Sequence, residues 1–264
     1  MKIVVCVKQV PDTSEVEIDP ITNTLIRTGI PVIVNPDDKA GIEIALSLKE
    51  QMEDCTVSVL TMGPPQAETA LLEALAMGCD EAYLLSGREF GGSDTLATST
   101  ALSAALSKIG YDLIITGRQA IDGDTAQVGP QIAEHLGIPH ISYTQKVECA
   151  GDNTFIVDRR YEDRIHRLRI HTPCLFTALS QACSPRYMTV SGVVDANEKP
   201  IHRLGFSDVK DALDVTAIGL QGSPTNVVRS FTKEPRGQGM LLCNLSADEA
   251  VDAIMAKLHE SHII

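Results

Sequence analysis

Residues 112–137 read DLIITGRQAIDGDTAQVGPQIAEHLG, in the order strand, glycine-containing loop and helix. The run at 112–116 is short and apolar, which is typical of a buried parallel strand. The helix that is predicted to start at Asp124 ends at Gly137, and it places its apolar residues on one side: Val128, Ile132, Ala133 and Leu136. This stretch therefore predicts one buried strand and the crossover helix that follows it.

The same alternation precedes this stretch. Further apolar runs at 2–7, 56–61 and 82–85 predict buried strands. Helical periodicity separates them, with helices predicted to open at Asn35-Pro36, to cover 66–77 and to start at Ser93. Strands that alternate with helices of about ten to sixteen residues predict right-handed βαβ units. The predicted fold class is therefore α/β, a Rossmann-like doubly wound parallel sheet.

Three segments depart from this alternation. Residues 16–27 predict a β-hairpin within the first crossover, and residues 155–160 and 165–171 predict added antiparallel strands. From about Val190 the chain reads as irregular, until a helix at 247–258 that Ser246 would cap. We therefore predict a domain at 1–189 and, at 190–264, an extended arm that ends in a helix and docks on another subunit. A disordered tail is the alternative.

Composition narrows the function classes. The chain has 264 residues and a formal net charge of −13, which argues against nucleic-acid binding. No apolar run approaches the ~20 residues that span a bilayer, and no cleavable signal follows the first strand. The seven cysteines form no CxxC pair, and the histidines show no metal-ligand spacing. We expect a cytoplasmic protein without membrane insertion and without a metal site. The absence of GxSxG leaves no candidate catalytic nucleophile.

Four loops at strand ends are candidates for ligand binding, because ligands of open parallel sheets bind beyond the carboxyl ends of the strands. These loops cover residues 8–13, 62–65, 91–95 and 117–130. Neither GxGxxG nor a P-loop motif is present, so together the loops favour a nucleotide site without a specific fingerprint. Asp124 and Gln127 also fit a capping box, an alternative structural explanation for the last loop. Asp122 and Asp124 would repel a phosphate, so they would cap, or accept from a ribose hydroxyl or an adenine amine.

Five arginines lie close together in this acidic chain, at positions 159, 160, 164, 167 and 169. On an alternating strand Arg167 and Arg169 share a face with His171. A solvated face or a subunit contact explains them most simply.

Several segments occur in the order and spacing found in the beta subunits of electron-transfer flavoproteins, and the sequence resembles that family over nearly its whole length. They are VVCVKQVPD at 4–12, NP at 35–36, ALAMG at 74–78, GRQAID at 117–122 and SPRY at 184–187. A further family segment resembles residues 157–178, but YEDRIH at 161–166 replaces the usual small acidic and glycine residues. The resemblance implies a heterodimer with an FAD-carrying alpha subunit. It also implies an adenine nucleotide in this subunit, either structural AMP or a second FAD.

Two segments, 7–13 and 91–98, look like those of the NADH-oxidising, flavin-bifurcating members. Residues 188–200 also lack the basic recognition loop that mitochondrial members offer to acyl-CoA dehydrogenases. The resemblance thus implies FAD as cofactor and NADH as electron donor. It implies ferredoxin or flavodoxin as one acceptor and a flavin-dependent dehydrogenase of acyl-CoA, enoyl-CoA or hydroxy-acid type as the other.

The resemblance also carries over site residues. The adenylate end would be lined by Cys6, Asn35, Asp38 and Met62. Adenosine and phosphates would be wrapped by Gly117, Gln119, Ala120, Gly123, Asp124, Thr125, Ala126, Gln127 and Val128, with backbone donors at 124–127. The ribityl chain or flavin ring would be approached by Asp94, Thr95 and Thr98. The nicotinamide would be bordered by Val10, Pro11, Asp12 and Thr13. Two alternatives stay open: an AMP-holding electron-carrier subunit, and a universal-stress-type adenine-nucleotide-binding regulator.

Overall fold

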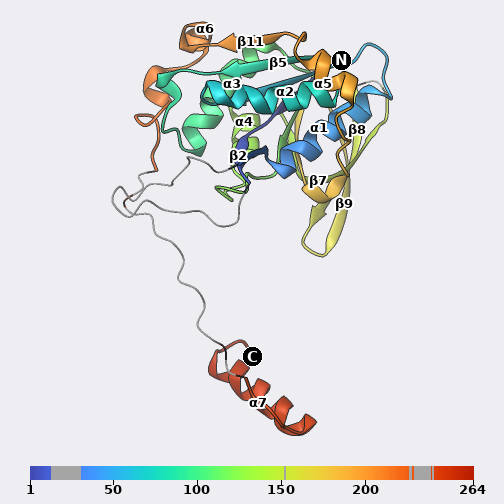
Figure 1. Cartoon of the computed structure of the whole chain (residues 1–264), viewed down its shortest axis with the longest axis vertical. Helices are drawn as coiled ribbons and strands as arrows, with labels where there is room; N and C mark the ends of the chain where they lie inside the picture. The colour runs from blue at the N-terminus through green and yellow to red at the C-terminus, as the bar shows by residue number, and fades with distance from the viewer. Residues whose placement is uncertain (13–30, 152, 226–227, 229–238, 240) are drawn as a thin grey trace. The chain divides into compact units, whose positions relative to one another are not determined.

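The computed structural model describes residues 1–12, 31–151, 153–225, 228, 239 and 241–264 (Figure 1). The chain divides into two compact units, each considered by itself. The larger unit contains the sheet and continues to residue 228, past the boundary predicted at residue 189. The smaller unit includes the C-terminal helix α7 (Ala247–Glu260). The hairpin predicted at 16–27 lies outside the described residues.

Within the described residues, nine strands form one sheet in the order β11-β5-β4-β1-β6-β10-β7-β8-β9. Strands β11 to β7 of this order pair in parallel, whereas β7, β8 and β9 pair antiparallel. The strands are β1 (Lys2–Cys6), β4 (Thr56–Met62), β5 (Glu81–Leu85), β6 (Leu113–Gly117), β7 (His140–Cys149), β8 (Thr154–Tyr161), β9 (Arg164–His171), β10 (Cys174–Ala178) and β11 (Ile201–Leu204). A separate antiparallel pair joins β2 (Gln9–Pro11) to β3 (Val32–Val34). The predicted parallel core with added antiparallel strands is confirmed.

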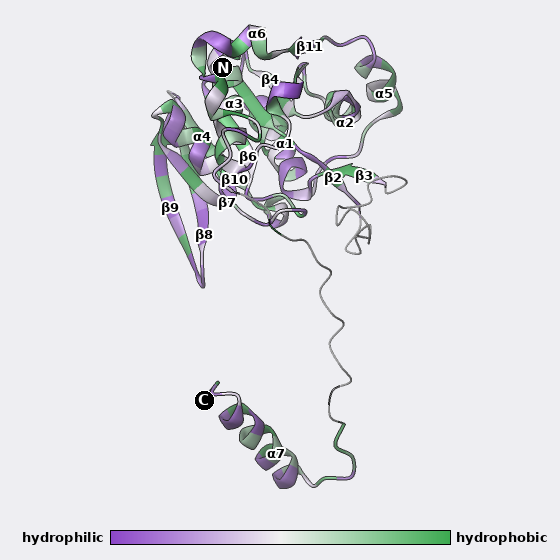
Figure 2. Cartoon of the chain, turned by 90° about the vertical axis from the view of Figure 1, so that its left-hand side faces the viewer, coloured by the Kyte–Doolittle hydropathy of each residue, from purple (hydrophilic) through white to green (hydrophobic). Residues whose placement is uncertain are grey.

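The central strands are buried on both faces, which explains why they read as continuous apolar runs. In β1, Ile3 and Val5 pack into one hydrophobic cluster and Val4 and Cys6 into the other. Figure 2 shows this apolar centre in green, between helices of mixed hydropathy. Burial on two faces fixes the sheet as the middle layer of the larger unit.

Helices cover both faces of this sheet (Figure 1). The two clusters assign α1 and α2 to one face and α3 and α4 to the other; α5 packs on α2, and α6 contacts α3. The bounds are α1 (Pro36–Lys49), α2 (Glu68–Met77), α3 (Thr95–Ile109), α4 (Val128–Leu136), α5 (Val190–Ala196) and α6 (Phe206–Val209). None of the helices in the described part of the chain is both long and apolar enough to span a membrane.

Two helix starts differ from their predictions. Helix α3 begins at Thr95 and is capped by Asp94, whose Oδ1 accepts from the Ala97 N–H at 3.0 Å, so Ser93 lies one residue before the cap. Helix α4 begins at Val128 instead of Asp124. The capping box of Asp124 and Gln127, which the sequence left open as an alternative, does not form, because Asp124 and Ala126 have left-handed φ values of 50° and 53°. These two residues extend the loop and delay the helix.

The segment after residue 190 is more ordered than its sequence predicts. Strand β11 pairs in parallel with β5, with Ile201 opposite Ala82, and extends the edge of the sheet. Ala196 and Val209 are each only 2% exposed, so α5 and α6 belong to the packed unit. The predicted C-terminal helix and its Ser246 cap are confirmed, with a capping box between Ser246 and Glu249.

Candidate functional site

The sheet reverses its winding direction between β1 and β6. From β1 the chain proceeds outward through β4 and β5, and then returns to place β6 on the other side of β1. In open α/β sheets the ligand crevice lies outside the carboxyl ends of the strands at such a switch point. Cys6 at the end of β1 and Gly117 at the end of β6 mark that place here.

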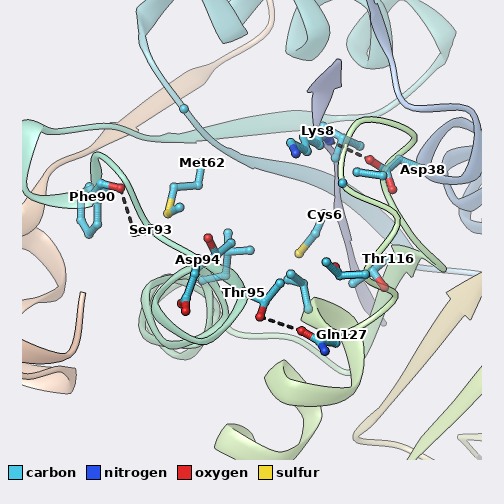
Figure 3. Close-up of a pocket in the computed structure, with 18 of the residues that line it drawn as sticks. Cys6, Lys8, Asp38, Met62, Phe90, Ser93, Asp94, Thr95, Thr116 and Gln127 are labelled. Carbon is cyan, nitrogen blue, oxygen red and sulfur yellow. Dashed lines mark hydrogen bonds between the residues drawn. The ribbon is translucent and has the colours of Figure 1, made fainter. Parts of the chain in front are cut away.

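A pocket of about 850 Å³ opens at this switch point (Figure 3). It extends from the loop after β6 to the loop after β5, and the starts of α3 and α4 face it from two sides. Most of the predicted site residues line it: Cys6, Asp38, Met62, Asp94, Thr95, Thr98, Gly117, Gln119, Ala120, Gly123, Thr125, Ala126, Gln127 and Val128. The fold thus brings loops that are far apart in sequence to one cavity.

Other predicted residues are absent from the pocket lining. Asn35 is buried behind the pocket surface and Asp124 is exposed in the loop after β6, both as described below. Val10 and Pro11 belong to β2, and Asp12 follows it. Val10 is fully buried, so its side chain is not accessible to a ligand in this structure. Thr13 lies outside the described residues. None of the described residues of the predicted nicotinamide segment lines the pocket, whereas Val7 and Lys8, which precede it, do.

Asp38 joins the two strands at the switch point. Its carboxylate accepts from the Lys8 N–H at 2.7 Å and from the Gly117 N–H at 2.9 Å. Burial raises the pKa of Asp38 to about 7, although the N–H donors of Lys8 and Gly117 and the side chain of Asn35 act to lower it. Burial likewise raises the pKa of the adjacent Cys6 thiol to about 12. Asp38 therefore fixes the base of the pocket.

Gly117 is required by this contact. A Cβ at Gly117 would lie 2.1 Å from Asp38 Oδ1 and 2.8 Å from the Asp38 backbone nitrogen. A side chain would separate β6 from the start of α1, so the closeness of the two backbones depends on glycine.

The loop after β6 is positioned by Asn35 and Asp37, which flank the first residue of α1. Asn35 is fully buried; its Nδ2 donates to the Gln119 carbonyl at 2.8 Å and its Oδ1 accepts from the Ile121 N–H at 3.1 Å. Asn35 is the predicted N-cap residue, but its side chain holds this loop instead of capping α1. The Asp37 carboxylate accepts from the Ser180 N–H and forms an ion pair with Arg118. The amino end of α1 therefore sets the loop conformation.

The second half of this loop presents backbone donors. In the part of the chain that the structure describes, the N–H groups of residues 125–128 have no hydrogen-bond acceptor. The N–H of Asp124 donates to the Ala120 carbonyl, so the donor predicted there is already used. The Asp124 carboxylate accepts from Gln119 Nε2 at 2.7 Å, and Ala126 takes the left-handed conformation. Consecutive free N–H groups at a helix start form a site that suits an anion.

The loop after β5 forms the opposite side of the pocket. It contributes residues that the sequence analysis did not select: Ser86, Gly87, Arg88 and Phe90. The only sequence feature that could have identified these residues is their position directly after a predicted strand. Thr95 Oγ1 donates to Gln127 Oε1 at 2.8 Å and links the two loops across the pocket (Figure 3).

Three cations line the pocket, and two of them are neutralised. Lys8 forms an ion pair with Asp122 at 2.7 Å, and Arg118 one with Asp37 at 3.4 Å. Arg88 is exposed and has no ion pair within the described residues. Asp122 therefore reduces the positive charge near the loop instead of facing a ligand.

The arginine-rich strand lies on the edge of the sheet, in the β8–β9 hairpin (Figure 1). Arg167 pairs with Glu148 and Asp158, and the Arg159 guanidinium lies 5.4 Å from the ring centre of Tyr161. None of these arginines lines the pocket. Among the described residues no group of three histidine, cysteine or acidic side chains is placed to hold a metal ion, and all seven cysteines are free.

Comparison with known proteins gives consistent matches. A family model described as the electron transfer flavoprotein domain matches residues 22–208. The chain is 51% identical, over all of both chains, to an electron transfer flavoprotein subunit beta of Clostridium acetobutylicum. It is 48% identical, again over all of both chains, to a subunit of the caffeyl-CoA reductase–Etf complex of Acetobacterium woodii and to the acryloyl-CoA reductase electron transfer subunit gamma of Anaerotignum propionicum.

Proposed function

This chain belongs to the electron transfer flavoprotein family as a beta subunit, and from that premise we propose that its switch-point pocket binds FAD. The observation that carries the proposal is the loop at 117–128. Its backbone at Gly117 lies close to Asp38, and its N–H groups at 125–128 have no acceptor among the described residues. Such a loop accommodates a pyrophosphate without a basic side chain. AMP, the alternative that the sequence left open, remains the competing ligand.

The residues present fit an adenine dinucleotide. The free N–H groups at 125–128 suit phosphate oxygens, and the hydroxyls of Thr95, Thr98 and Thr125 suit the hydroxyls of a sugar or ribityl chain. The pocket also continues to the separate loop after β5. Its volume of about 850 Å³ is in the upper part of the usual ligand-pocket range of roughly 300–1,000 Å³. A dinucleotide would occupy the pocket from the α4 side to the loop after β5, whereas AMP would need only the α4 side. The extent of the pocket therefore favours FAD.

In this proposal the protein supplies position and electrostatics. Asp38, Asn35 and Gly117 hold the donor loop in place, and Asp94 fixes the start of α3 opposite to it. When bound, FAD would supply the redox chemistry, taking hydride from NADH and releasing the two electrons singly. No side chain of this subunit needs to act as acid or base. NADH would reach the pocket beside Lys8, near the segment 10–13.

We further propose that this subunit works in a complex. One electron would go to ferredoxin or flavodoxin, and the other through an FAD of the alpha subunit to a flavin-dependent dehydrogenase of acyl-CoA, enoyl-CoA or hydroxy-acid type. Two relatives carry the names of CoA-ester reductase complexes, which supports the CoA-ester type. Helix α7 supports docking of the C-terminal arm on the alpha subunit, because Val251, Ile254 and Met255 expose an apolar face at helical spacing.

Nucleotide analysis of the purified heterodimer tests the proposal. Release of the bound nucleotides followed by chromatography should give two FAD per heterodimer. Anaerobic addition of NADH should then bleach the visible flavin absorbance. One FAD and one AMP, with no bleaching by NADH, would replace the proposal with the structural-AMP alternative. A beta chain that is stable and well folded to its C-terminus without any alpha subunit would favour the stand-alone regulator instead.

A further inference from the structure

The loop after β5 is held by a segment far along the chain. Residues 218–225, here called the strap, lie against residues 89–94 of this loop. The Leu220 N–H donates to the Gly91 carbonyl at 3.0 Å, and the Gly219 N–H donates to Ser93 Oγ at 3.1 Å. The side chain of Ile218 is 2% exposed and belongs to the same hydrophobic cluster as Phe90. The strap is therefore packed against the pocket wall and is not a loose connection.

Two strap residues bind directly to the cap of α3. The Asp94 N–H donates to Ser223 Oγ at 2.8 Å, and Asp94 Oδ2 accepts from the Thr225 N–H at 3.0 Å. The other carboxylate oxygen, Oδ1, accepts from the Ala97 N–H. Both oxygens of Asp94 are therefore used within the protein, so Asp94 joins the strap to α3. Burial acts to raise the pKa of Asp94, but the N–H donors of Ala97 and Thr225 outweigh it and lower that pKa.

The backbone of the strap is shaped for this contact. Gly219 has a left-handed φ of 62°, and a Cβ there would lie 2.3 Å from the Glu89 carbonyl oxygen. A Cβ at Gly222 would lie 2.1 Å from the carbonyl carbon of Ala217. Such close approaches require glycine at both positions. The tight backbone places Ser223 Oγ where it also meets the carbonyls of Gly219 and Gly92, at 2.7 and 3.3 Å.

We propose that the strap is a positioning element for the nucleotide pocket, and that Ser223 and the Asp94–Thr225 contact hold residues 91–95 in the conformation that retains the ligand. The inference rests on the proposed function, because it assumes a nucleotide in this pocket. Residues 91–95 line the pocket, while the strap residues that hold them do not. Retention of the nucleotide and order in the strap are then linked: each stabilises the other, as thermodynamic coupling requires.

The test compares single-hydroxyl deletions in the complete heterodimer. Ser223→Ala removes the acceptor of the Asp94 N–H, and Ser223→Thr restores a hydroxyl. Ser107→Ala is the matched control, because Ser107 lies on α3, bonds only a backbone carbonyl at 2.9 Å and does not line the pocket. We expect Ser223→Ala to release its nucleotide about tenfold faster. Ser223→Thr and Ser107→Ala should release at the wild-type rate, and the thermal midpoints of the stripped proteins should agree.

Hydrogen exchange gives a second readout that does not depend on a substitution. Removing the nucleotide should speed amide exchange in a peptide covering 217–225, and adding FAD should slow it again. The β8–β9 hairpin serves as the internal reference, because none of the pocket-lining residues lies in it.

The outcomes separate the two ideas. If the wild-type heterodimer holds its nucleotide and Ser223→Ala holds it equally well, with exchange at 217–225 unchanged on stripping, the strap proposal is wrong and the proposed function stands. If the wild-type heterodimer neither carries a nucleotide nor protects any pocket residue when FAD or AMP is added, the proposed function is wrong, and the role of the strap in retention is refuted with it.

Discussion

The loop after β6 and the loop after β5 face the same pocket, but residues from different parts of the chain hold them. The first loop is bound by Asn35, Asp37 and Asp38, at the start of α1. The second is bound by the strap at 218–225. The first loop leaves the N–H groups of 125–128 without acceptors among the described residues, whereas Asp94 of the second has both carboxylate oxygens occupied.

This difference separates two tasks. A loop that binds an anion must keep polar groups unsatisfied until the ligand arrives, so buried side chains behind it must fix its conformation. A loop that only closes the far side can satisfy its own polar groups. We therefore expect substitutions behind the first loop to remove binding and stability together, and contacts between the loops to matter least.

The largest effect is expected from Gly117→Ala. The added Cβ would lie within 3 Å of Asp38 Oδ1, the Asp38 backbone nitrogen and Asp37 Cβ, and the backbone nitrogen cannot move aside. We expect a loss of more than about 4 kcal/mol in the free energy of unfolding and a heterodimer without nucleotide in this subunit. Denaturant unfolding and nucleotide analysis measure the two. Gly123→Ala is the control for the unfolding measurement alone, since nothing lies within 4 Å of a Cβ there. Equal stability of the two variants would contradict the close approach of β6 and α1.

The next largest effect concerns pH and Asp38. Because folding raises the pKa of Asp38 from 3.8 to about 7, the folded chain holds this proton more tightly than the unfolded chain. The stability that this group contributes is therefore full below about pH 4 and is lost as the pH rises through 7. At 1.4 kcal/mol per pKa unit, wild type should lose about 3 kcal/mol relative to Asp38→Asn between pH 4 and 7. A wild-type-minus-variant difference that stays flat over this range would show that Asp38 is ionised throughout.

Asn35→Ala should have a smaller effect that is confined to the first loop. It leaves the Gln119 carbonyl and the Ile121 N–H without their partner, at a cost of about 2 kcal/mol. Nucleotide affinity should fall, and hydrogen exchange at 118–123 should rise while that of the strap stays unchanged. Asn197→Ala is the control, because its exposed amide donates to a single backbone carbonyl, that of Val193. Faster exchange in the strap as well would mean that the two loops are not held independently.

The sequence predicts those parts of the site that depend on buried apolar strands better than those that depend on contacts between distant residues. The apolar runs at 2–7 and 112–116 mark β1 and β6, and the rule about carboxyl ends then places Gly117 beside Cys6. The start of α4 is mispredicted because Asp124 and Gln127 fit a capping box. In the structure Asp124 instead accepts from Gln119, in a left-handed conformation that spacing does not reveal.

The other differences have the same origin. Strand β11 carries only four residues, with exposed His202 and Arg203, so no apolar run marks it, and its pairing with β5 supplies the order. The strap reads IGLQGSPT, a short mixture of apolar and polar residues with two glycines and a proline, which has no periodicity and therefore reads as an irregular tail. Its structure arises from hydrogen bonds to residues more than a hundred positions earlier, such as that of Ser223 to Asp94. No local pattern encodes a contact of this kind.

The smallest effect tests the link between the two loops. Thr95 Oγ1 and Gln127 Oε1 form the bond that crosses the pocket at 2.8 Å, and this bond is exposed although Thr95 itself is half-buried. An exposed neutral bond of this kind exchanges readily with water, so Gln127→Ala should cost about 0.5 kcal/mol or less and change nucleotide release less than about threefold. A double-mutant cycle with Thr95→Val should give a coupling energy of similar size. If the coupling instead exceeded about 1 kcal/mol, the two loops would act as one closed clamp, and the division between a binding loop and a closing loop would have to be abandoned.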